Sequence, residues 1–168
     1  GSTREERAAS MPGDELVKTP KFVANHATTI EAPPSVVWPW LVQLGQDKGG
    51  FYSYAALESL LGAGVTNADR IDPSWQQTAV GDPLLLFRSS AGKPFGLEVQ
   101  SMDENRRFVA GKPVSLGLGF QWIFDLTPEG DGTRLVVRER YVVPFATSAS
   151  RYPVSPAPNA AATSVASR

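Results

Sequence analysis

Cysteine is absent from the sequence, and histidine occurs only once, at His26. A chain without thiols cannot form disulfides or thiolate nucleophiles, and it lacks the Cys and His clusters that hold transition metals. The glycines within residues 47–50 do not follow the strand, loop and helix pattern of a phosphate-binding loop. We therefore expect no metal site and no bound cofactor.

Neither sign of charge dominates, since 16 Lys and Arg oppose 17 Asp and Glu for a formal net charge of -1. Such a chain has no long-range positive field for phosphate polymers, so nucleic acid is not an expected partner. No apolar run approaches the roughly 18 residues of a membrane span, and the first residues are charged rather than apolar as in a signal peptide. The sequence therefore predicts a soluble protein without a membrane span, most simply cytoplasmic.

The chain divides into three segments by composition. Residues 1–20 combine charges with Ala, Pro and Gly without periodicity, which predicts a flexible or loosely docked leader that adds little to the core. Residues 21–143 form the expected ligand-binding domain, long enough to bury a core and still leave room for a pocket. Residues 144–168 are rich in Ala, Ser and Pro with few large apolar groups, so we expect them to be mainly disordered.

The first elements are a strand and a short helix. Residues 22–31 favour a strand that ends at the sequence Ala-Pro-Pro, which removes backbone donors. Ser35 stands where it can cap a helix that Gly45 then ends. Pro39 lies near the start of this helix, where a missing N–H is tolerated.

The rest of the folded segment alternates between turns and strands after one further helix. Helical spacing indicates a second short helix over residues 54–61. Alternating apolar residues and turn signals then predict antiparallel strands over residues 84–87, 95–101, 107–110, 119–126 and 134–143. The fold class is therefore α+β, with a curved antiparallel sheet around two short helices.

Particular residues add a family resemblance to this order of elements. The Trp-Pro-Trp at residues 38–40 and the Tyr-Ser-Tyr at residues 52–54 are the most specific part of it. Residues 30–54 closely resemble a bacterial branch of the START-like superfamily, also called SRPBCC, and weaker similarity extends over residues 15–143. This superfamily includes polyketide cyclases and dehydrases and lipid-transfer domains.

The resemblance implies a helix-grip fold with a deep apolar cavity that different members use for binding, transport or cyclisation. Members normally end in a long amphipathic helix that covers the sheet, but residues 144–168 lack the repeated large apolar groups that such a helix needs. The helix is thus predicted to be absent or degenerate. A partner subunit in a homodimer, a swapped segment or the leader are the candidates to cover the sheet in its place.

Two titratable residues are candidates for acid and base chemistry. His26 has the same strand parity as Ile30, and histidine is the residue type best suited to proton transfer near neutral pH, although a structural role at a sheet edge is the alternative. Glu139 alternates with the apolar Val137 and Tyr141, which points its carboxylate toward the predicted cavity. The same orientation sends Arg134, Arg138 and Arg140 outward as a solvated ladder, and the parity of Glu98 predicts that it is exposed.

Aromatic side chains are the candidates for ligand contacts, because they offer large apolar surfaces and polar tips that can orient a planar molecule. Simple core packing is the alternative for each of them. The set comprises Trp38, Tyr52, Tyr54, Trp75, Trp122 and Tyr141, of which Tyr54 and Trp122 are preferred.

Three functions follow from these candidates. The first is the binding of a hydrophobic or amphipathic small molecule in an internal cavity, for which aromatic burial supplies the affinity. The second is a metal-free cyclase or dehydratase-like enzyme in which Glu139 or His26 moves protons. The third is a partner-binding or self-associating module that uses an uncovered face of the sheet.

Overall fold

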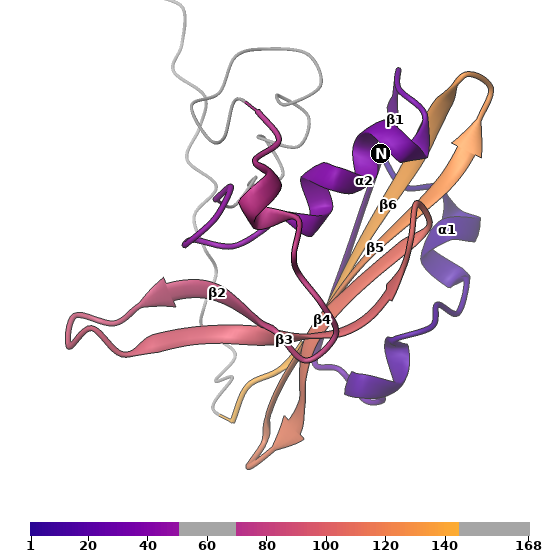
Figure 1. The fold of residues 1–168 in the computed structure, drawn as a ribbon. Coiled ribbons are helices and arrows are strands. Elements are labelled where there is room, and N and C mark those ends of the chain that lie inside the picture. Colours follow the sequence, from indigo (N-terminus) through magenta and orange to yellow (C-terminus); the bar gives the residue numbers. More distant parts are fainter. Residues whose placement is uncertain (51–69, 145–168) are drawn as a thin grey trace, which may run out of the picture.

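The computed structural model describes residues 1–50 and 70–144, and a six-stranded antiparallel sheet forms most of this part of the chain (Figure 1). The strand order is β1-β6-β5-β4-β3-β2, so the chain runs as a meander from β2 to β6 while β1 closes the far edge. The strands are β1 Phe22–Ile30, β2 Pro83–Arg88, β3 Pro94–Asp103, β4 Arg107–Ser115, β5 Leu118–Glu129 and β6 Gly132–Val142.

Short helices lie on both sides of the sheet. The helix α2 (Pro34–Val42) contacts one face, which we call the inner face, and the opposite outer face is covered by α1 (Arg4–Ala8) and the 3₁₀ helix η1 (Asp14–Val17). A further 3₁₀ helix, η2 (Pro73–Trp75), precedes β2. The predicted α+β class and the curved antiparallel sheet are confirmed. The second predicted helix, residues 54–61, and residues 145–168 of the predicted tail lie outside the described residues.

Two local predictions need correction. The N-cap of α2 is Pro33, which makes no side-chain cap, so Ser35 lies inside the helix; a proline at the first helical position, Pro34, sets the backbone for the first turn instead. The strand predicted over residues 107–110 continues to Ser115. The pairing of β4 with β3 ends at Gly111, which is opposite Glu98. Pro113 lies beyond this point, so its missing N–H removes no hydrogen bond to β3.

The inner face carries the main core, in which α2 packs on β4 and β5. Phe108 is 1% exposed and meets the rings of Trp38 and Phe124 edge to face, with centroid distances of 6.3 and 6.2 Å. Leu41 is buried in the same cluster. Such aromatic pairs add to the burial of apolar area, so this contact fixes α2 to the sheet.

The leader packs against the outer face, and the expectation that it adds little to the core is wrong. Met11 joins a second buried cluster with Ala27, Ile123 and Val136, and Val17 is fully buried. The leader is also excluded as the replacement for a C-terminal helix over the inner face, because its contacts lie on the opposite side of the sheet. A partner subunit and a swapped segment remain the predicted candidates to cover the inner face.

The outward arginines of β6 hold the leader in place and do not form a solvated ladder. Arg138 is 3% exposed and donates to the carbonyl oxygens of Glu6 (2.9 Å) and Ala9 (2.8 Å), to the Asp14 carboxylate (2.8 Å) and to Asn25 Oδ1 (2.8 Å). These contacts satisfy carbonyls at the end of α1 that the helix leaves unpaired. A buried side chain therefore links the leader to the sheet.

Two further ion pairs flank this contact. Arg134 Nε lies 2.7 Å from Glu6 Oε1, and the hydrogen bond from this guanidinium lowers the pKa of Glu6 below its usual value. Arg140 lies 3.1 Å from Asp14 Oδ1. The alternation of β6 correctly predicted that both arginines lie on the outer face. Their partners, Glu6 and Asp14, lie in the leader, whose sequence has no periodicity from which these contacts could be predicted.

Replacing Gly13 by alanine is expected to destabilise the protein by about 1–3 kcal/mol, because Gly13 has a φ of +109° and its added Cβ would lie 3.0 Å from Ile123 and Val109 side chains. Urea unfolding measures the loss. Gly92→Ala is the matched control, since Gly92 has a φ of +74° but no atom within 4 Å of an added Cβ. A Gly13→Ala protein no less stable than Gly92→Ala would contradict the close packing of the leader.

Candidate functional site on the inner face

Strand register places the two candidate catalytic residues on the inner face. Residues directly opposite each other in an antiparallel pair project to the same side of the sheet. His26 is opposite Val137, and Glu139 is opposite Trp122. Because Val137 belongs to the inner core cluster, His26 and Glu139 share that face, as the alternation of β6 predicted for Glu139.

Three aromatic rings form a continuous row across the inner face at one end of the sheet. Tyr141 stacks on Phe22 of β1 with a centroid distance of 5.0 Å and on Phe120 of β5 at 5.6 Å. The interplanar angles are 19° and 14°, so the three rings are nearly parallel. Phe22 is 43% exposed, and Tyr141 and Phe120 are half-buried. The row is a partly open apolar surface.

The next row of the sheet combines a carboxylate with an indole. Glu139 lies between Ala24 of β1 and Trp122 of β5, and Ala110 of β4 follows Trp122. Glu139 and Trp122 are both half-buried, and the Trp122 ring packs on Phe124 at 4.8 Å. At the ends of this row, Ala24 is half-buried, and Ala110 is 0% exposed and belongs to the main core cluster.

The remaining sequence candidates have different surroundings. His26 is exposed on the edge strand β1, and Trp75 is half-buried in η2. Trp38 is buried in α2 against Phe108, which is the core-packing alternative. Tyr52 and Tyr54 lie outside the described residues. The structure therefore brings together Glu139, Trp122 and Tyr141, with His26 on the same face, while the catalytic and ligand roles stay predictions.

Sequence reasoning missed several residues of this face. Phe22 and Phe120 complete the stacked row, and Lys112 places its Nζ 5.5 Å from the centroid of the Phe95 ring. Phe120 and Trp122 are two positions apart in β5, so the alternation of the strand could have placed Phe120 on the inner face from the sequence alone. The stacking itself depends on register between strands. Glu98 is exposed, as its parity predicted.

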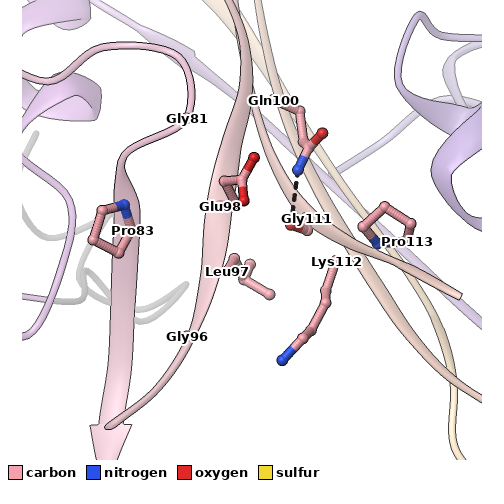
Figure 2. Close-up of a pocket in the computed structure, with 9 residues that line it drawn as sticks. All are labelled: Gly81, Pro83, Gly96, Leu97, Glu98, Gln100, Gly111, Lys112 and Pro113. Carbon is pink, nitrogen blue, oxygen red and sulfur yellow. Dashed lines mark hydrogen bonds between the residues drawn. The ribbon is translucent and has the colours of Figure 1, made fainter. Parts of the chain in front are cut away.

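The sheet opens where β3 and β4 separate, and Figure 2 shows the side chains around this gap. A hollow of about 240 Å³ lies there, and Gln100 Nε2 donates to the Gly111 carbonyl oxygen at 3.2 Å along its side. Leu97 and Glu98 line it from β3 and Lys112 from β4. Two more hollows, each of about 330 Å³, lie along the leader on the outer face.

Within residues 1–50 and 70–144, no three His, Asp or Glu side chains lie close enough together to hold a metal ion. In the same ranges, no helix is long and apolar enough to cross a membrane.

No protein-family model matches the chain, and no curated protein matches it. Among solved structures it is similar to the Mll3558 protein from Rhizobium loti, with a TM-score of 0.43 and 19% identity, covering 72% of this chain and 78% of that one. For DynU16, a protein of the dynemicin biosynthetic locus, the TM-score is 0.42 at 16% identity, covering 72% of this chain and 38% of that one. For the Aha1 dimer from Colwellia psychrerythraea, the TM-score is 0.40 at 17% identity, covering 77% and 81%.

The order and packing of the elements identify the fold. β1 and α2 precede an antiparallel meander, the last strand β6 returns to pair with β1, and α2 packs on the inner face. The chain therefore has the α+β helix-grip architecture found in START-like proteins.

Proposed function

We propose that the inner face binds a hydrophobic or amphipathic small molecule with a flat ring system. The supporting observation is the nearly parallel row of Phe22, Tyr141 and Phe120, which leaves aromatic surface partly open to solvent. Aromatic surface of this kind gains affinity when a planar apolar ligand removes it from water. The neighbouring Glu139 carboxylate offers such a ligand a hydrogen-bond acceptor at one edge.

Native mass spectrometry of the freshly purified protein tests the proposal directly, because a co-purified small molecule adds a defined mass. Binding of the fluorescent probe 1-anilinonaphthalene-8-sulfonate supplies a titration. Tyr141→Ala and Phe120→Ala are each expected to weaken probe binding about tenfold, since each removes one ring of the row. Tyr141→Phe keeps the ring and serves as the matched control, with nearly wild-type affinity.

Two results would count against ligand binding. One is a protein that carries no small molecule and does not bind the probe. The other is wild-type affinity in both alanine variants while circular dichroism shows an intact fold, because the probe would then occupy another surface.

A second candidate function is a cyclase or dehydratase-like activity on a polyketide-type substrate. Its support is that Glu139 and His26 project to the same face, with Glu139 half-buried beside Trp122. A carboxylate in this position is suited to general acid or base work. Glu139→Gln is expected to preserve probe binding and abolish turnover, and unchanged turnover would reject this assignment.

A further inference from the structure

The hairpin tip between β4 and β5 carries an apolar residue in a conformation that does not favour it. Leu116 is 97% exposed and has a φ of +51°, next to Gly117 with a φ of +74°. Asn, Asp and Gly are the usual residues at such turn positions, because left-handed backbone crowds a branched side chain. Leu116 is thus strained and also exposes its whole apolar side chain. Neither property stabilises the free protein.

Other exposed apolar side chains gather at the same end of the sheet. Ser115 pairs with Leu118 at the hairpin tip, Gly119 pairs with Val142, and Phe22 pairs with Tyr141, so the tip, the start of β1 and the end of β6 lie together. Of the six large apolar side chains that are exposed in the described ranges, four lie here, namely Phe22, Val23, Val114 and Leu116.

The charges near this tip have one predominant sign. Lys18, Lys21 and Lys112 are exposed, and residues 16–25, 111–124 and 140–144 contain no acidic residue, while the exposed Glu15 and Glu98 lie just beyond these segments. Backbone contacts fix the first two at this end: Arg140 donates to the Lys18 carbonyl oxygen at 3.2 Å, and the Lys21 N–H donates to Tyr141 O at 3.1 Å.

The opposite end of the sheet carries the acidic residues. The turns from β3 to β4 and from β5 to β6 lie there, because Arg107 opposes Asp125 and Thr133 opposes Ile30. The exposed acidic side chains of this end are Glu31, Asp103, Glu104, Glu129 and Asp131. Within the described residues, the exposed charged side chains at the hairpin tip are therefore basic and lie beside exposed apolar ones, whereas at the opposite turns acidic side chains outnumber the exposed Arg106.

We propose that the basic end, formed by the β4–β5 tip, the start of β1 and the end of β6, docks on the surface of an anionic lipid bilayer. The tip projects at the lower end of the molecule in Figure 1, a convex shape that enters a lipid interface more readily than it matches a flat protein surface. Leu116 inserts among the acyl chains, and the lysines contact the head groups. The acidic end then faces away from the membrane. This inference does not depend on a ligand at the inner face.

Vesicle co-sedimentation tests the proposal. The wild-type protein should bind vesicles that contain about one third phosphatidylglycerol, bind phosphatidylcholine vesicles weakly, and dissociate as salt is raised. Leu116→Asn should weaken binding about tenfold or more and should not lower the melting temperature, because Asn suits the left-handed backbone. The double variant Lys18→Glu/Lys21→Glu should also weaken binding at least tenfold.

Two matched controls change the same residue types elsewhere. Val80→Asn removes an exposed apolar side chain before β2, and Lys93→Glu reverses an exposed charge in the turn between β2 and β3. Both should bind vesicles like the wild type. Absent vesicle binding by the wild type, or equal loss in tip and control variants, would overturn the proposal. So would a dimer in sedimentation velocity that Leu116→Asn converts to a monomer, because the tip would then bind a second copy of the chain.

Discussion

Replacing Arg138 by alanine is expected to lower the free energy of unfolding by about 3–5 kcal/mol, the cost typical of removing one partner from a buried ion pair. The substitution removes one of the two guanidinium partners of the Asp14 carboxylate, so that Arg140 alone remains, and it leaves the carbonyl oxygens of Glu6 and Ala9 without their donor. Unsatisfied buried groups each add a desolvation penalty. The leader should therefore detach at lower urea concentrations than those that unfold the wild type.

Urea unfolding followed by circular dichroism measures this loss, with hydrogen exchange across residues 1–20 as the local readout. Arg106→Ala is the control, because the Arg106 side chain is 67% exposed and its pair with Asp103 spans 3.8 Å, so less than about 1 kcal/mol is expected. Arg138→Lys keeps the charge but cannot reproduce the forked contacts, so an intermediate loss should follow. An Arg138→Ala protein as stable as Arg106→Ala would show that these contacts do not hold the leader.

The contrast between Glu139 and Arg138 explains which features the sequence could predict. Alternation with Val137 and Tyr141 was enough to assign opposite faces to these two residues, and the register confirms both. Alternation cannot predict what covers an outward side chain. Arg138 bonds mainly to backbone carbonyls of the leader, and carbonyls leave no pattern in a sequence, so the leader was expected to be loose.

The candidate site shows the same limit. Trp122, Tyr141 and Glu139 were chosen from single strands and lie on the inner face, but the stacked row also needs Phe22 and Phe120. Its geometry arises from the pairing of β1 with β6 and of β6 with β5, which joins residues more than 100 positions apart in the first case. The alternation within each strand predicts the face on which a side chain lies, whereas its neighbours on that face depend on the register between strands.

Phe108→Ala is expected to be as destabilising as Arg138→Ala, by about 3–5 kcal/mol, for a reason that concerns the inner face. The Phe108 ring is 1% exposed and lies between Trp38 of α2 and Phe124 of β5. Its removal leaves a cavity at the point where the helix meets the sheet. Both Trp38 and Phe124 lose a ring contact, so α2 is held less firmly against the sheet, beside the row of Glu139 and Trp122.

Urea unfolding monitored by tryptophan fluorescence checks this prediction, and Phe22→Ala is the matched control. Phe22 is 43% exposed and stacks on Tyr141, so its removal should cost less than about 1 kcal/mol while it weakens binding of the fluorescent probe. Phe108→Leu should lose less than Phe108→Ala, because more of the volume remains. Equal stability of Phe108→Ala and Phe22→Ala would show that α2 is not anchored through this ring, and the inner face would then lack the rigid wall that a selective ligand site requires.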